Sequence, residues 1–513
     1  MRIRLAVVLV GLAGPVWAET PLSAIDWLSQ SVVTPVAQPA PEQVTNEPAV
    51  TAGGALPDDV SVSVLGGPDP DAVGLLPPQI TGLPRNLWGL GHTKDIAAAL
   101  FDHDLQSLPA LQGLLITLLL AEADAPVDGN GKGRLLVARI DRLLALGALD
   151  QARALLDAVG PLADADLFRR SFDVALLTGD EDHACAAMRA TPNLAPTFPA
   201  RIFCLARSGD WNAAALTLRT AEALGHVTPD EAALLSRFLD PDLYEGDAAP
   251  PAPSKVTPLT WRLFEAIGEP LSTTALPLAF AHAELRDTAG WKAQIEAAER
   301  LARAGAIAPN VLLGLYTDRM PAASGGVWDR ADAFQEFDAA LTRGDPLAVA
   351  QALPLAWAQM VAMELEVPFA VLFADRLAAL PLSGAAASLS FEIGLLSQSY
   401  RRIAAAHVAV GAREEFLVGL AAGDLAGLTA PDSIGRAIAP AFAAKPVLAD
   451  EAAQMIAQNR TGEAILWAAG RIANGVQGDL RGVGDGLVVL RHLGLEDVAT
   501  RTALELMLLE RRG

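Results

Sequence analysis

A short pattern that runs from glycine to alanine recurs three times in the first half of the chain, and it limits the fold more than any other feature. The copies read LGALDQARALL, TGDEDHACAAM and SGDWNAAALTL, and their glycines are Gly147, Gly179 and Gly209. Glycine commonly ends a helix in the left-handed conformation. A period of about 30 to 40 residues is typical of helix–turn–helix repeats that share one core with their neighbours.

Two other residue types in the pattern support this interpretation. In the second and third copies an aspartate follows the glycine, and we expect Asp180 and Asp210 to cap the next helix. Each copy also places an alanine five residues after its glycine, which lets paired helices pack closely. These alanines are Ala152, Ala184 and Ala214.

The composition of the whole chain agrees with a helical fold. It is 52% hydrophobic but only 5% aromatic, and alanine and leucine, both strong helix formers, carry the excess. A chain of 513 residues is too long for one core. We therefore predict an all-α protein, an α-solenoid of helix–turn–helix repeats in two parts. The parts are 85–244 and 259–513, joined by a proline-rich linker at 245–258.

The recurring G-D-x-x-x-A pattern resembles tetratricopeptide-like and Sel1-like repeats. The resemblance covers roughly 135–240, with fainter copies in TRGDPLAVAQAL and NRTGEAILWAAG. The tryptophan, tyrosine and proline positions of the tetratricopeptide consensus are not met. Taken whole, the chain resembles exported α-helical proteins of alphaproteobacteria through PLSAIDWLS, LPRNLWG and ASGGVWDR. This resemblance implies a fold class and no particular activity.

The first residues have the layout of a secretory signal peptide, which we place at 1–18. Arg2 and Arg4 form a basic region, 5–12 form a short apolar run, and small residues precede a cleavage site before Glu19. The alternative is an uncleaved signal anchor. No later segment is expected to span a membrane. We therefore predict a periplasmic protein, exported through a cleaved N-terminal signal peptide.

The next segment, 19–84, contains eleven prolines, eight acidic residues and neither lysine nor arginine. Such a segment cannot bury enough apolar surface to fold by itself, so we predict a disordered acidic tether. Within it, PLSAIDWLSQSVV places Leu22, Ile25 and Leu28 at helical spacing, with Trp27 beside them. This stretch is either a short docking helix or an unstructured leader.

The chain has two cysteines, Cys185 and Cys204. Export places them where disulfides persist, and two cysteines without histidine partners are too few for a structural zinc site. A proline-rich turn between the two expected helices can bring the cysteines side by side. We therefore predict a Cys185–Cys204 disulfide, and the alternative is a pair of free buried thiols.

The charge of the chain limits its partners. The formal net charge is −22, so nucleic acid and anionic membrane surfaces are disfavoured. The expected partner is an envelope protein or peptide whose identity, like the oligomeric state, the sequence does not give.

Several motifs that suggest chemistry lack an essential residue. DGNGKG is not a phosphate-binding loop, because Lys132 is followed by Gly133 rather than Ser or Thr, and it is not a calcium loop, because Arg139 stands where an acid is required. DHD and DEDH are more typical of helix starts than of metal sites. No G-x-S-x-G or H-E-x-x-H motif is present. We predict no metal, no cofactor and no enzymatic activity.

One local motif is a candidate ligand contact. In ASGGVWDR, the amides of Ser324, Gly325 and Gly326 precede an expected helix and could cradle an anion, with Arg330 assisting. The alternative is an ordinary helix start.

The tryptophans lie mostly in helical patterns, which favours a place in the core over ligand contact. The function predicted from these features is a non-enzymatic periplasmic helical-repeat protein that acts as a protein- or peptide-binding scaffold in the cell envelope. The alternative is an accessory factor or enzyme acting on cell-wall glycan, which release of muropeptides by the purified protein would favour.

Overall fold

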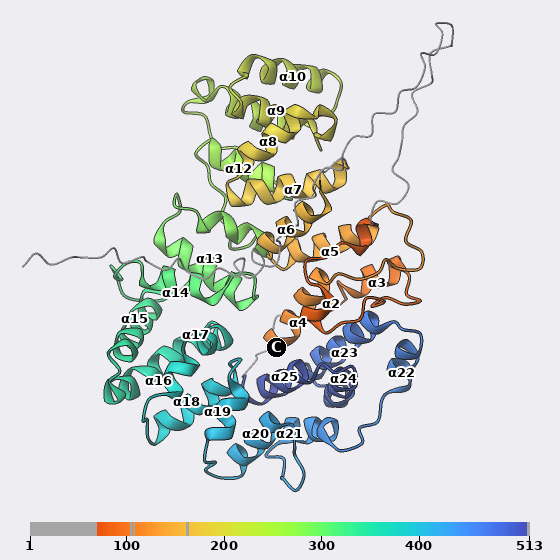
Figure 1. Ribbon diagram of the computed structural model, residues 1–513. Helices are drawn as coiled ribbons and strands as arrows, with labels where there is room; N and C mark the ends of the chain where they lie inside the picture. Colours follow the sequence, from red (N-terminus) through yellow and green to blue (C-terminus); the bar gives the residue numbers. More distant parts are fainter. Residues whose placement is uncertain (1–68, 103–104, 106–107, 161–163, 510–513) are drawn as a thin grey trace, which may run out of the picture. The chain divides into compact units, whose positions relative to one another are not determined.

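The computed structural model describes residues 69–102, 105, 108–160 and 164–509 (Figure 1). In this part of the chain the regular elements are all helices, and the β contact that occurs is an isolated bridge between Leu76 and Ala121. The predicted all-α class is therefore confirmed. No helix in these ranges is both long and apolar enough to cross a membrane. The predicted leader and the stretch around Trp27 lie outside the described residues.

The elements follow one another in this order. The first are η1 (Pro70–Ala72), α2 (Pro78–Thr81), α3 (Thr93–Ala99), α4 (Pro109–Leu120), α5 (Arg134–Ala145) and α6 (Leu149–Val159). Next come α7 (Ala165–Thr178), α8 (Glu181–Ala190), η2 (Pro192–Leu194), α9 (Phe198–Arg207), α10 (Trp211–Ala223), α11 (Pro229–Leu239) and η3 (Pro241–Tyr244). The middle of the chain forms α12 (Pro258–Ala266), η4 (Leu278–Leu285), α13 (Trp291–Arg303), α14 (Pro309–Thr317), α15 (Val327–Arg343), α16 (Pro346–Ala362), α17 (Glu366–Ala378) and α18 (Ala385–Leu395). The last are α19 (Tyr400–Ala406), α20 (Ala412–Ala422), α21 (Ser433–Ile438), η5 (Ala439–Phe442), α22 (Asp450–Ala457), α23 (Thr461–Val476), α24 (Leu480–His492) and α25 (Glu496–Leu508).

The three glycines of the recurring pattern lie between paired helices, as predicted. Gly147 separates α5 from α6, Gly179 separates α7 from α8, and Gly209 separates α9 from α10. Their φ angles are 73°, 84° and 85°, in the left-handed region that glycine adopts without strain. The alanines that follow them are buried. The helices of each pair pack against each other.

The capping prediction is right for one aspartate and wrong for the other. Asp210 accepts a hydrogen bond from the amide of Ala213 at 3.1 Å and caps α10. Asp180 stands before α8 but makes no capping bond there. Its carboxylate pairs with Arg153 of α6 at 2.6 Å instead.

The predicted disulfide is confirmed. Cys185 of α8 and Cys204 of α9 are bonded, with their Cα atoms 5.0 Å apart. Both cysteines are buried in one cluster with residues of α7, α10 and α11. The bond therefore joins two neighbouring helices inside their shared core.

Of the predicted tether 19–84, residues 69–84 belong to the fold, and 19–68 lie outside the described residues. Leu76 and Leu83 are buried, and the backbone beside Leu76 bonds to the end of α4. Asp71 is also buried, and it accepts a hydrogen bond from the amide of Leu136 at 2.8 Å in the first turn of α5. The acidic residue that made this stretch resemble a solvated tether is thus a cap for a distant helix.

A buried arginine fastens this stretch to α4. Arg139 of α5 donates to the carbonyls of Leu119 at 2.7 Å, Val73 at 2.7 Å and Ala121 at 3.1 Å. Leu119 and Ala121 lie at the end of α4, where carbonyls have no partner within the helix. Burial lowers the pKa of Arg139 to about 10, although the nearby charge of Asp71 raises it. The side chain is therefore charged at neutral pH, and Arg139, which stands where a calcium loop would need an acid, joins α5 to the end of α4.

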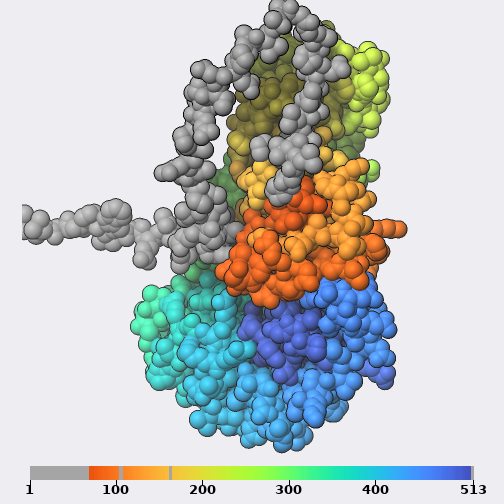
Figure 2. Space-filling model, turned by 45° about the vertical axis from the view of Figure 1, so that its right-hand side comes forward, coloured from red at the N-terminus to blue at the C-terminus, as the bar shows by residue number. Residues whose placement is uncertain are grey.

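The first and last helices share one hydrophobic core. This cluster combines buried residues between Leu76 and Leu167 with buried residues between Ala374 and Met507. In Figure 2 the orange surface of the first helices meets the blue surface of the last ones. The ring of Trp88 packs over Gly462, where a Cβ would lie 2.4 Å from it.

Hydrogen bonds reinforce this joint between the two ends. The carboxylate of Glu505 on α25 accepts from the amide of Ala110 at 3.0 Å, in the first turn of α4. The amide of Gly462 donates to the carbonyl of Leu87 at 2.8 Å. The start of α4 is thus capped by a residue near the other end of the chain.

The predicted division into 85–244 and 259–513 is not confirmed. The shared core of the first and last helices crosses it. Residues 245–257 are irregular, as a linker would be, but α12 beyond them buries Leu259, Leu263 and Phe264 in the cluster that contains the disulfide. The irregular segment therefore connects helices that lie in one core.

Candidate functional site

The residues predicted as a ligand contact are turned toward the protein's own side chains. The amide of Gly325 donates to the carboxylate of Asp329 at 2.7 Å, so this donor already has an anionic partner. Ser324 and Gly326 lie beside it in an exposed turn before α15. Arg330 lies in α15, just after this turn, but its side chain bonds to Glu299. The structure therefore does not bring it together with the three amides. A ligand at this turn would have to displace Asp329.

Arg330 forms a buried ion pair with Glu299 of α13. Its Nε and Nη2 donate to the two carboxylate oxygens at 2.8 and 2.7 Å. The hydroxyl of Tyr316 donates to the same carboxylate at 2.6 Å. Burial and the charge of Glu299 raise the pKa of Tyr316 well above its usual value. All three groups are satisfied by one another, so this cluster joins α13, α14 and α15 and offers no free reactive atom.

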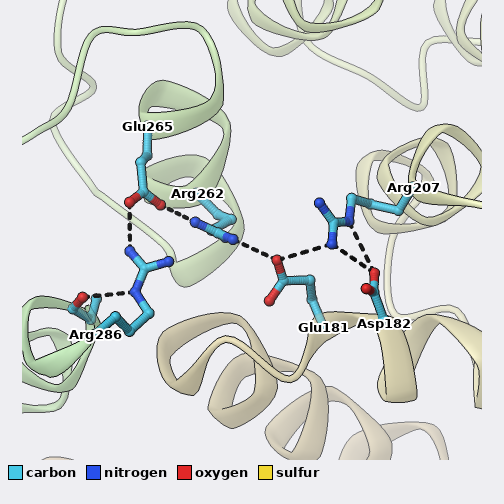
Figure 3. Close-up of polar contacts among 7 residues, drawn as sticks. Glu181, Asp182, Arg207, Arg262, Glu265 and Arg286 are labelled. Carbon is cyan, nitrogen blue, oxygen red and sulfur yellow. Dashed lines mark hydrogen bonds and ion pairs between the residues drawn. The ribbon is translucent and has the colours of Figure 1, made fainter. Parts of the chain in front are cut away.

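A second set of ion pairs runs across α8, α9, α12 and the end of η4 (Figure 3). Its centre is Glu181, which is buried at the start of α8. One oxygen of its carboxylate contacts Arg262 of α12 and lies 3.5 Å from Arg207 of α9. The other oxygen, Oε2, is buried and has no hydrogen-bond donor among the described residues. We call Glu181, Arg207, Arg262, Glu265 and Arg286 the ion-pair brace.

The two ends of the ion-pair brace are anchored differently. Arg207 also bonds Asp182 at 2.8 Å, in an exposed position. Arg286 pairs with Glu265, donates to the carbonyl of Ala283 at 2.7 Å and lies 5.4 Å from the centre of the Trp261 ring. Burial lowers the pKa of Arg262, but the hydrogen bond and charge of Glu181 outweigh it and the net pKa is raised. The arrangement joins α8, α9 and α12 and connects α12 to the residue that follows η4.

A cavity with a volume of about 680 Å³ lies among the last helices. Its walls come from the loop after α20, from η5 and the loop that follows, and from the end of α24. The lining residues are Gly423, Asp424, Leu425, Ala426, Ala439, Phe442, Ala443, Ala444, Pro446, Val488, Arg491, His492 and Glu496. The volume is within the range of about 300 to 1,000 Å³ that small-molecule sites occupy. We call it the α24 cavity.

Arg491 is held rigidly in the wall of the α24 cavity. Its guanidinium lies 4.4 Å from the centre of the Phe442 ring, and it donates to the carbonyl of Ala441 and to Glu496 at 2.8 Å. Stacking on an aromatic ring keeps the planar group in one orientation. The arginine therefore presents a fixed charged face beside an apolar wall.

Other charges surround the mouth of the α24 cavity. Asp424 and Glu496 are exposed there, and so is His492. The α20 and α24 helices both end at the cavity, at Ala422 and His492, so their partly negative carbonyl ends face it. Apolar walls with both signs of charge at the rim suit an amphipathic ligand such as a peptide side chain with its backbone.

A smaller cavity of about 180 Å³ lies beside α17, α18 and α19 and includes His407 in its lining. The Nε2 atom of His407 lies 2.7 Å from a carboxylate oxygen of Glu414, and the imidazole stacks on Phe391 with ring centroids 3.6 Å apart. Burial raises the pKa of Glu414, but the bonds from His407 and from the Val410 amide outweigh it, so the net pKa is lowered. This pair is positioned by the loop that joins α19 and α20.

Sequence reasoning missed both cavities. His407 and Glu414 are seven residues apart across a loop, and Arg491 meets Phe442 from a different helix, so neither pair follows a recognisable motif. The small residues Ala443 and Ala444, which line the α24 cavity, were the one available signal, because small residues leave space. Within the described ranges, no group of three or more His, Cys, Asp or Glu side chains could hold a metal ion.

The comparisons with known proteins give no relative. No family model matches the chain, and no curated protein or solved structure matches it either.

Proposed function

We propose that this protein is a non-enzymatic helical-repeat scaffold that binds an envelope protein or peptide, and that the α24 cavity receives a side chain of that partner. The observation that carries the proposal is the cavity itself. Its apolar wall would desolvate an anchor side chain, while Arg491 and the acidic rim would bond to the adjacent peptide backbone. Buried anchors with a polar rim are the usual anatomy of a peptide-binding surface.

The test is to fill the α24 cavity from its exposed edge. Ala444 is exposed in the loop after η5, so Ala444→Trp should occupy the cavity without disturbing the core. Peptides selected from a random library on the wild-type protein should bind this variant at least about tenfold more weakly by calorimetry. Ala98→Trp, at an exposed site on α3, is the matched control and should bind normally. Peptides that bind both variants as well as wild type would contradict the proposed site.

We also infer that the protein is exported to the periplasm through cleavage before Glu19. The support is the basic and apolar layout of 1–18, together with the disulfide in the core, which persists in an oxidising compartment. Intact mass and N-terminal sequencing of the protein from a periplasmic fraction should show a chain that starts at Glu19 and has no free thiol. A cytoplasmic protein that retains Met1 would contradict export.

The repeat character belongs to the same proposal. The pairs α5–α6, α7–α8 and α9–α10 each turn at a left-handed glycine and bury an alanine behind it, which supports a tetratricopeptide-like or Sel1-like origin for this region. Repeats of this kind serve as binding surfaces in many proteins.

A further inference from the structure

A second surface, separate from the α24 cavity, combines exposed aromatic and aliphatic side chains with unpaired carboxylates. Trp211 begins α10, and 49% of it is exposed. Its ring lies 6.2 Å from the ring of Phe238 near the end of α11. Leu243 and Tyr244 follow in η3, and Leu243 is 70% exposed. We call Trp211, Phe238, Leu243 and Tyr244 the Trp211 surface.

Three carboxylates flank the Trp211 surface. Asp240, Asp242 and Glu245 are exposed in and around η3. Within the described residues none of the three forms an ion pair. The nearby cation, Arg237, is already engaged, because it stacks 5.2 Å from the Tyr244 ring centre, donates to the carbonyl of Ala248 at 2.8 Å and approaches Asp247 at 3.9 Å.

We propose that the Trp211 surface binds a cationic amphipathic segment of a partner protein, which packs its apolar side chains on Trp211 and Leu243 and places its lysines or arginines on the three carboxylates. Trp and Tyr are the side chains that most often carry binding energy at protein interfaces. The carboxylates give the surface a charge that a basic partner complements, and the net charge of −22 steers such a partner toward it.

The same charges disfavour the other occupants. A second copy of this chain brings identical carboxylates to the contact, and like charges across an interface repel. An anionic lipid surface is repelled for the same reason. A basic protein segment is therefore the partner class that matches both the apolar and the charged parts of the surface.

Three synthetic helical peptides of about 14 residues test the partner chemistry, one of Lys and Leu, one of Glu and Leu, and one of Lys and Ser. Binding to the full chain is followed by fluorescence anisotropy. The Lys/Leu peptide should bind, and it should bind more weakly as salt rises from about 50 to about 200 mM. The Glu/Leu peptide should not bind, and the Lys/Ser peptide should bind at least about tenfold more weakly because it lacks the apolar anchor. Equal binding of the Lys/Leu and Lys/Ser peptides would overturn the proposal.

Variants locate the site. The double variant Trp211→Ser, Leu243→Ser should weaken binding of the Lys/Leu peptide at least about tenfold. The triple variant Asp240→Asn, Asp242→Asn, Glu245→Gln should weaken it by a similar factor. A control with the same loss of charge neutralises three exposed acids elsewhere, namely Asp287→Asn, Glu336→Gln and Glu451→Gln. Equal weakening by the two charge variants would show nonspecific attraction and overturn the proposal.

Further measurements keep the result interpretable. Circular dichroism and thermal unfolding should show that each variant folds as wild type does, since all the altered residues are exposed. Concentration-dependent dimerisation that the Trp211 and Leu243 changes abolish would assign the surface to a second copy and overturn the proposal. Ala444→Trp should leave binding of the Lys/Leu peptide unchanged, so failure here is distinct from failure of the α24 cavity proposal.

Discussion

Most buried charges in the described part of the chain have specific partners, whereas the half-buried Asp173 of α7 forms no ion pair there. The neighbouring Arg170 donates from Nε and Nη2 to Asp141 at 2.6 and 2.7 Å, and so it is committed to another carboxylate. Burial raises the pKa of Asp173 to about 6, although the charges of Arg169 and Arg170 lower it. The folded protein therefore favours the protonated form of this residue.

This raised pKa predicts a specific dependence of stability on pH. Between about pH 4 and pH 6 the folded state binds more protons at Asp173 than the unfolded state, so stability falls as the pH rises through that window. Asp173→Asn supplies a permanently neutral side chain. It should raise the free energy of unfolding by about 1 to 3 kcal/mol at pH 7.5 and change it little at pH 4. Urea unfolding at both pH values checks this, with exposed Asp332→Asn as the control. A similar change at both pH values would contradict the assignment.

Arg139 gives the second prediction at this scale. Arg139→Met preserves most of the side-chain volume but leaves buried carbonyls at the end of α4 without donors and Asp71 without a counter-charge. Because a buried polar group without a partner is strongly unfavourable, we expect a loss of about 3 to 5 kcal/mol in the free energy of unfolding. Arg134→Met, at an exposed position in the first turn of α5, should change stability by less than about 1 kcal/mol. Chemical denaturation of the two variants measures both free energies of unfolding, and equal losses would contradict a structural role for Arg139.

At the scale of helices, α8 is held in place from two sides. Cys185 bonds it to α9, and Glu181, one turn earlier, connects it to α12 through Arg262. A disulfide that closes a loop of this size contributes about 3 kcal/mol in the chain-entropy model. The irregular segment 245–257 does not fix the position of α12, so the Glu181–Arg262 pair and the burial of Leu259 and Phe264 together hold this helix in place.

The two arginines that share Glu181 should therefore differ in effect. The Arg262 side chain is 19% exposed, and its loss in Arg262→Met leaves a buried carboxylate with one distant partner. We expect a loss of about 3 kcal/mol or more. The Arg207 side chain is 38% exposed, and Arg207→Met should lose less than about 1 kcal/mol. Equal losses in urea unfolding would show that the ion-pair brace has no dominant pair.

At the scale of the whole molecule, the shared core of the first and last helices predicts how the chain responds to a cut. A protease site inserted at 248–252, in the irregular segment before α12, would be accessible to cleavage. The two pieces should stay associated after cleavage in size-exclusion chromatography, and neither piece expressed alone should unfold cooperatively, because each lacks part of the core. A matching site at 321–325, in the exposed turn before α15, should give the same result. Two pieces that separate and unfold independently would restore the two-part division.

Local features of this fold could be predicted from the sequence, and long-range ones could not. The left-handed turns at Gly147, Gly179 and Gly209 and the disulfide depend on residues within about two helices of one another, where spacing carries the information. The hydrogen bond from the amide of Ala110 to Glu505 joins residues that are far apart in the sequence, and no repeat or helical period connects their positions. Asp180 was misassigned because Arg153, its partner, lies on another helix.

The candidate site was harder to predict than the fold, for a related reason. The motif at Ser324–Gly326 looked open in the sequence, since nothing there reveals that Asp329 folds back onto Gly325. The α24 cavity depends on space left between several elements, and alanine is as common in packed helices as beside a void. Trp211 is exposed whereas Trp261 and Trp291 are buried, and all three lie near the start of a helix.

The packing of Trp88 on Gly462 and of Glu505 on the amide of Ala110 has a mechanical consequence. Most helical chains can fray inward from a loose end, one turn at a time. Here the helices near one end of the chain pack against the helices near the other end. An unfoldase that pulls on either terminus must therefore break the contacts of both sets of helices at once, and the protein should unfold in a single step.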